Sequence, residues 1–218
     1  MMSFFGRRLS ARGLISWRDP PYDAVHIHTA GRGEMKKTAL LVIDVQESFR
    51  HRPFWTEQDL PAYREAQQAL IAGAQARGVP VINILHEAGA DGPFSAVSGL
   101  VRPLDWMTHQ PAATFVKHVH NALTDSGLQS WLIKHGIQKL VISGIRTEQC
   151  CETTTRVASD LGYEVDFVTE ATLTFPMTHA GSGVVYSAAD IRARTELVLA
   201  GRFAAIVTVE EALRRMAD

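Results

Sequence analysis

Apolar residues follow two alternating patterns from Thr38 to the end of the chain. Short runs rich in β-branched residues alternate with longer stretches in which apolar positions recur every three or four residues. The short runs predict strands over residues 38–45, 79–85, 114–117, 139–144, 164–169 and 204–207. The longer stretches predict helices over residues 60–77, 127–135, 150–161, 187–199 and 209–216. This alternation is typical of a doubly wound α/β domain, in which crossover helices connect parallel strands.

Two long connections interrupt the alternation, over residues 86–113 and 171–186. Both are richer in Gly, Pro, Ser and Thr than the segments around them. Connections of this length inside a compact domain usually carry function. We therefore expect them to contribute residues to a binding site.

Three reactive side chains fall at the carboxyl ends of predicted strands: Asp44, Lys117 and Cys150. Open parallel sheets bind ligands at these ends, so the fold is expected to bring the three together. A cysteine attacks as its thiolate, and a nearby cation and a helix N-terminus both lower its ordinary pKa of about 8.5. Asp44 would accept the thiol proton and pass it to a leaving amine, which describes amide hydrolysis through a thioester.

Composition excludes several classes of protein. With 46% apolar and 21% charged residues and a net charge of −1, the chain is expected to be globular and to bind neither nucleic acid nor membrane surfaces. Its apolar runs are far shorter than the roughly 20 residues of a membrane-spanning helix. The only cysteines, Cys150 and Cys151, are neighbours and cannot form a disulfide framework. We therefore expect a cytoplasmic protein.

Residues 1–34 differ from the rest of the chain. Five arginines outnumber three acidic residues, and no helical or strand pattern persists. We expect a disordered leader, or translation begun upstream of a start at Met35, with a targeting role as the alternative. Residues 35–218 would then form the functional domain.

Three motifs give the chain a resemblance to the isochorismatase-like cysteine hydrolases. They read Leu-Leu-Val-Ile-Asp-Val-Gln over residues 40–46, Phe-Val-Lys over 115–117 with Asn-Ala-Leu over 121–123, and Ser-Gly-Ile-Arg-Thr-Glu-Gln-Cys-Cys-Glu-Thr-Thr over 143–154. That family includes nicotinamidases, N-carbamoylsarcosine amidases, ureidoacrylate amidohydrolases and isochorismatases. The resemblance implies a Rossmann-like, three-layer α/β/α domain with a six-stranded parallel sheet.

The resemblance also implies roles for individual residues. Asp44 would be the acid/base, Lys117 the stabiliser of the thiolate, and Cys150, rather than Cys151, the nucleophile. It further implies a cis peptide between Ile145 and Arg146, with the backbone amides of Arg146 and Cys150 forming an oxyanion hole. A homo-oligomer, either a dimer or a tetramer, is expected on the same grounds.

The sequence departs from the family pattern where nicotinamidases carry an Asp-x-His metal motif. Residues 85–89 read Leu-His-Glu-Ala-Gly, so we expect no metal and no cofactor. A cysteine in the third motif favours cleavage of a C–N bond in a small amide, carbamoyl or ureide compound. Two alternatives remain open: a vinyl ether hydrolase, and a catalytically silent or redox-active member that binds a ligand.

Six residues are candidates for contact with the small-molecule substrate, and each has a structural alternative, such as packing. The candidates are Gln46, Phe49, His86, Trp106, Arg146 and His179. Gln46 could orient Asp44 through a hydrogen bond, and the planar fork of Arg146 could bind a substrate carboxylate.

Overall fold

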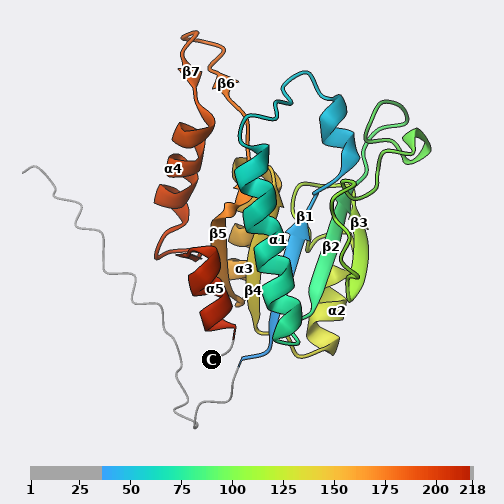
Figure 1. The fold of residues 1–218 in the computed structure, drawn as a ribbon, viewed down its shortest axis with the longest axis vertical. Coiled ribbons are helices and arrows are strands. Elements are labelled where there is room, and N and C mark those ends of the chain that lie inside the picture. Colours follow the sequence, from blue (N-terminus) through green and yellow to red (C-terminus); the bar gives the residue numbers. More distant parts are fainter. Residues whose placement is uncertain (1–35, 217–218) are drawn as a thin grey trace, which may run out of the picture. The chain divides into compact units, whose positions relative to one another are not determined.

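A computed structural model describes residues 36–216, which form a three-layer α/β/α domain (Figure 1). Its centre is a six-stranded parallel sheet with the strand order β3-β2-β1-β4-β5-β8. The strands are β1 (Thr38–Ile43), β2 (Val81–His86), β3 (Ala113–Lys117), β4 (Lys139–Ile145), β5 (Glu164–Leu173) and β8 (Ala205–Ile206). The α-helices are α1 (Leu60–Ala76), α2 (Leu128–Lys134), α3 (Glu152–Asp160), α4 (Ala188–Leu199) and α5 (Val209–Arg215). The expected fold class is confirmed.

The central position of β1 in the sheet explains the continuous apolar run in its sequence. Every residue of β1 is buried, and the strand pairs with β2 on one side and β4 on the other. Successive side chains point to opposite faces of a sheet. Leu40 and Val42 accordingly pack in one hydrophobic cluster, whereas Leu41 and Ile43 pack in the other.

Helices cover each face of the sheet. Helices α1 and α5 lie over one face, where Leu70 and Ala212 join the same cluster as Leu40 (Figure 1). Helices α2 and α3 lie over the opposite face, where Leu132 and Ala158 pack with Leu41. Because helices cover both faces of the sheet, polar side chains gather at the ends of its strands.

The connection expected over residues 171–186 is partly wrong. Strand β5 continues to Leu173, because after an irregularity in β4 its residues Thr172 and Leu173 pair with Gly144 and Ile145. The rest of the connection forms an antiparallel hairpin of β6 (Met177–Thr178) and β7 (Val185–Tyr186). The threonines and hydrophobic residues after Thr169 favour a strand. Because threonine is polar, the sequence pattern was interpreted as a connection.

The segment before α3 also differs from the expected helix over 150–161. Residues Thr147–Cys151 form a π-helical turn, and α3 begins only at Glu152. Two turns of 3-10 helix, Glu47–His51 and Ala96–Ser98, follow β1 and β2. Cys150 therefore lies in a turn at the end of β4.

The expectations for residues 1–34 lie outside the described residues. Within residues 36–216, no helix is both long and apolar enough to cross a membrane.

Gly144 is the glycine on which the sheet depends most closely. Its φ is +128°, and a Cβ atom there would lie 2.0 Å from the carbonyl oxygen of Ile43 on the adjacent strand. We expect Gly144→Ala to lower the free energy of unfolding by at least about 3 kcal/mol, measured by urea titration. Gly162→Ala is the matched control: φ is +90°, but nothing lies within 4 Å, so about 1 kcal/mol is expected. Equal losses for the two variants would contradict the close approach at Gly144.

Candidate active site

The three predicted catalytic side chains meet at the carboxyl edge of the sheet, where the strand order reverses between β1 and β4. Asp44 follows the last residue of β1, Lys117 is the last residue of β3, and Cys150 lies in the turn after β4. Lys117 Nζ is 2.8 Å from Asp44 Oδ2 and 3.4 Å from Cys150 Sγ. Ligand sites of doubly wound sheets lie at this reversal point.

The ammonium of Lys117 is buried and surrounded by acceptors. Besides Asp44 and Cys150, it lies 2.9 Å from Nδ1 of His86 and donates to the carbonyl oxygen of Val119 at 3.1 Å. Both Lys117 and Asp44 have 0% exposed side chains. A buried charge is tolerated only when it is paired and hydrogen-bonded, and this one is both.

The backbone around Asp44 directs its carboxylate into the site. Its φ is +54°, and its N–H donates to the carbonyl oxygen of Ile84 at 2.8 Å. Within residues 36–216, Oδ1 of Asp44 has no hydrogen-bond partner, and the Cys150 thiol is close enough to lower the pKa of the carboxyl. Asp44 is thus placed to accept the proton of that thiol.

The electrostatic balance corrects the expectation that Lys117 and a helix N-terminus lower the pKa of Cys150. Burial raises the pKa of the thiol, and the negative charge of Asp44 raises it further, more than Lys117 lowers it. The positive charge of Lys117 is already balanced by Asp44, so little of it remains to stabilise a thiolate. Burial and the charge of Asp44 therefore favour the neutral thiol form of Cys150.

The pKa of Asp44 also changes in a direction that suits proton transfer. Burial raises it above the ordinary value, and the attraction of Lys117 offsets this only in part. Burial lowers the pKa of Lys117, but Asp44 and Cys150 outweigh that effect, and the net change is upward. Lys117 remains charged, while Asp44 accepts a proton more readily than an exposed carboxylate does.

A cavity of about 670 Å³ opens next to these groups. Asp44 and Cys150 line it together with His86, His120 and Arg146. Its aromatic wall consists of Phe49, Phe54 and Phe94. A volume of this size accommodates a small organic molecule.

Comparison with known proteins settles the family. The model of the isochorismatase domain matches residues 38–211. The chain belongs to the isochorismatase family. Members of this family are hydrolases, and the protein is accordingly a hydrolase.

Three relatives illustrate how far the similarity extends. An uncharacterised isochorismatase family protein, YrdC of Bacillus subtilis (strain 168), is 28% identical over 185 residues, covering 81% of this chain and 94% of its own. Nicotinamidase 3 of Arabidopsis thaliana is 33% identical over 78 residues, covering 36% of this chain and 39% of its own. A cysteine hydrolase from Pseudomonas syringae pv. phaseolicola 1448A, solved by crystallography, has a TM-score of 0.74 at 22% identity, over 83% of this chain and 92% of that one. At that identity the last comparison bears on the fold alone.

The nucleophile turn of this isochorismatase family member contains the expected cis peptide between Ile145 and Arg146. The oxyanion hole formed by the amides of Arg146 and Cys150 stays a prediction. Cys151, next to the candidate nucleophile, is fully buried in the hydrophobic cluster under α3. Of the two thiols, Cys150 is therefore the one that lines the cavity.

Arg146 lines the cavity, but its charge is already paired. Its Nη2 lies 2.9 Å from Oε1 of Glu148, and its guanidinium carbon lies 4.7 Å from the ring centre of Phe54. Oε2 of Glu148 in turn accepts a hydrogen bond from Thr174 at 2.6 Å. A substrate carboxylate would have to share the guanidinium with Glu148, and carboxylate binding by Arg146 stays a prediction.

Gln46 does not bond Asp44 as expected. Its side chain is fully buried: Nε2 donates to the carbonyl oxygen of His86 at 2.9 Å, and Oε1 accepts from the N–H of His86 at 2.7 Å. The reason is the positive φ at Asp44, which turns the chain so that the two side chains no longer share a direction. Gln46 holds the backbone of His86 instead of touching the cavity.

Two other candidates also lie outside this cavity. Trp106 is buried in the cluster under α1, with its ring 6.0 Å from that of Tyr63, which is the packing role given as its alternative. His179 lies in the exposed hairpin, where its ring bonds Ser182. Both residues lie in long connections that lead away from the strand ends, so their positions in the sequence did not predict contact with the cavity.

His120 is a cavity residue that the sequence reasoning missed. Its Nδ1 lies 3.9 Å from Cys150 Sγ, and its ring is stacked parallel to that of His86 with centres 6.2 Å apart. The available signal was its position three residues after Lys117, within the turn that leaves β3.

Within residues 36–216, no three His, Cys, Asp or Glu side chains are grouped to hold a metal ion.

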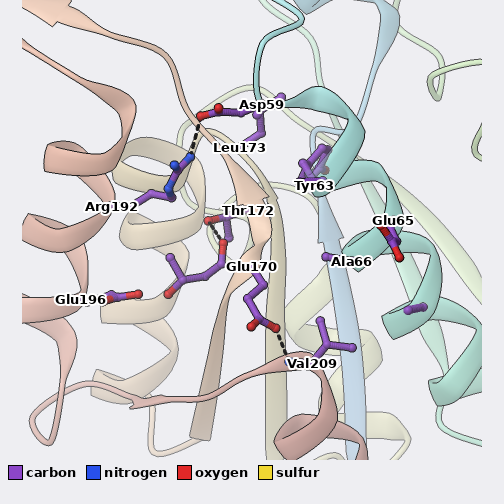
Figure 2. Close-up of a pocket in the computed structure, with 13 residues that line it drawn as sticks. Asp59, Tyr63, Glu65, Ala66, Glu170, Thr172, Leu173, Arg192, Glu196 and Val209 are labelled. Atoms are coloured by element: carbon purple, nitrogen blue, oxygen red, sulfur yellow. Dashed lines mark hydrogen bonds and ion pairs between the residues drawn. The ribbon is translucent and has the colours of Figure 1, made fainter.

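A second cavity, of about 610 Å³, lies between α1, β5 and α4 (Figure 2). Arg192 pairs with Asp59 at 3.0 Å across its mouth, and Glu170 accepts the N–H of Val209 at 2.8 Å. The first contact joins α4 to the residue before α1, and the second joins β5 to the first residue of α5. Asp44, Lys117 and Cys150 do not line this cavity.

The charge balance predicts opposite effects for two substitutions beside Cys150. Asp44→Asn removes the negative charge that raises the thiol pKa, so this pKa should fall and the thiolate absorbance should appear at a lower pH than in the wild type. Lys117→Met should raise the pKa and slow alkylation, while costing about 3–5 kcal/mol of stability because Asp44 loses its partner. The pH dependence of thiolate absorbance measures both changes, with Cys150→Ala as the blank.

A thiol pKa in Asp44→Asn that equals or exceeds the wild-type value would contradict this balance. Asn is a suitable replacement, because it tolerates the positive φ at this position.

Proposed function

We propose that the protein hydrolyses a C–N bond of a small amide, carbamoyl or ureide compound through a thioester on Cys150. The observation that supports this most directly is the position of the Lys117 ammonium, 2.8 Å from Asp44 Oδ2 and 3.4 Å from Cys150 Sγ. A thiol, a carboxylate of raised pKa and a charged ammonium in a buried cluster are the parts that acyl transfer needs. The name of the related nicotinamidase is consistent with amide cleavage in the family.

The first half of the proposed reaction acylates the enzyme. Asp44 takes the proton of the Cys150 thiol while the sulfur attacks the carbonyl carbon of the substrate. The resulting oxyanion would be held by the backbone N–H groups of Arg146 and Cys150. The tetrahedral intermediate collapses, and Asp44 returns the proton to the nitrogen that leaves as an amine or ammonia.

The second half releases the acid. Water attacks the thioester carbon, Asp44 accepts one proton from that water, and the C–S bond breaks. The Cys150 sulfur recovers a proton from Asp44, which restores the neutral thiol. Lys117 stays charged throughout and stabilises negative charge as it moves between the carboxylate and the sulfur. No metal or cofactor takes part in these steps.

The test is ammonia release from a panel of small amides, carbamoyl compounds and ureides by the metal-depleted protein. Cys150→Ala should lose activity by a factor on the order of 10³ or more, because it removes the nucleophile. Cys151→Ala is the matched control, an adjacent thiol buried away from the cavity, and should retain wild-type turnover.

Equal activity of Cys150→Ala and wild type would contradict the proposal. Hydrolysis of a vinyl ether by a protein that releases no ammonia would replace it with the alternative reaction.

A further inference from the structure

The ammonium of Lys117 determines the protonation state of His86. An ammonium has three N–H bonds, and four acceptors surround this one: Asp44, the Val119 carbonyl, Nδ1 of His86 and the Cys150 sulfur. The lysine has no acceptor lone pair, so Nδ1 of His86 must accept. Turning the ring over would place a C–H against the ammonium, so the ring orientation is determined as well.

It follows that His86 is neutral and carries its proton on Nε2. Burial and the charge of Lys117 lower the pKa of His86 to about 4, in agreement with this state. Within residues 36–216, Nε2 makes no hydrogen bond to another group of the protein. Because the ring lines the cavity beside Cys150, its Nε2–H is available to a bound molecule.

The ring is held in place from three directions. Gln46 bonds both the N–H and the carbonyl of the His86 backbone, Lys117 holds Nδ1, and Phe94 packs against the ring with centres 5.8 Å apart at 69°. Gln46 is fully buried, so its two bonds do not compete with water. A donor that is fixed before a ligand arrives loses little entropy on binding.

We propose that His86 is a specificity-determining residue whose Nε2–H donates a hydrogen bond to a carbonyl-type oxygen of the substrate at the reacting end of the cavity. This inference rests on the proposed function for the identity of the reaction, but the donor itself does not depend on turnover. It selects molecules with an acceptor close to the carbon that Cys150 attacks, and it disfavours those that present a second donor there. Gln46 is the positioning residue, because its two hydrogen bonds to the His86 backbone fix where the imidazole ring lies in the cavity.

Two thiol reagents test the donor without knowledge of the substrate. Iodoacetamide carries a carbonyl oxygen next to the carbon attacked by sulfur, whereas iodoethane carries no oxygen that could accept a hydrogen bond. In the full-length protein, His86→Leu should slow modification of Cys150 by iodoacetamide about fivefold to tenfold and change the other rate less than twofold. His86→Gln, which keeps an N–H donor, should recover most of the iodoacetamide rate.

The controls separate this role from support of Lys117. His135→Asn, at the exposed residue that follows α2, should change neither rate. If His86→Leu slows both reagents equally, His86 acts only through Lys117 and the proposal is overturned; if it slows neither, the proposal is also overturned. Amide turnover, measured on the same preparations, tests the proposed function separately. If His86→Leu slows only the reaction with iodoacetamide and wild type shows no amide turnover, the proposed amide hydrolysis is refuted, whereas the His86 hydrogen-bond donor is supported.

Discussion

The structure depends on the burial of one positive charge. The ammonium of Lys117 is withdrawn from water at the end of β3 and needs acceptors from its surroundings. They come from four adjacent strand ends: Asp44 after β1, His86 at the end of β2, Val119 after β3 and Cys150 after β4. Loss of one partner would leave a buried charge poorly compensated, so these strand ends are held in one geometry. The parallel sheet supplies the framework, and the ammonium specifies how its polar edge is assembled.

The buried charge of Lys117 also affects the protonation states of the groups around it. Asp44 neutralises Lys117, and this pairing leaves the buried Cys150 without a net positive field to stabilise a thiolate. In the proposed reaction, the thiolate forms by proton transfer to Asp44 when a substrate is present. A neutral thiol reacts slowly with adventitious electrophiles and oxidants, which protects a cysteine that lines an open cavity. The Lys117 charge also favours neutral His86, so one buried ammonium influences the charge states of Asp44, Cys150 and His86 together.

The sequence predicts the parts of this arrangement that depend on periodicity and strand ends. The buried run of β1 and the positions of Asp44, Lys117 and Cys150 at strand ends follow from alternation and from the geometry of parallel sheets. The contacts of Gln46 with His86 instead of Asp44 could not be predicted, because they depend on a positive φ at a single residue. Trp106 and His179 lie in long connections whose paths local pattern does not determine. The direction of the thiol pKa depends on distances to two opposite charges and on burial, none of which one sequence provides.

The most direct test of the account is the protonation state of Cys150 at neutral pH, read from the S–H stretching band in the infrared difference spectrum between wild type and Cys150→Ala. Cys151 contributes equally to both proteins and cancels. The account predicts a positive S–H band at pH 7, from a thiol that donates to Asp44. A difference spectrum without that band would show a standing thiolate, and it would contradict the claim that Asp44 and Lys117 neutralise each other around a neutral nucleophile.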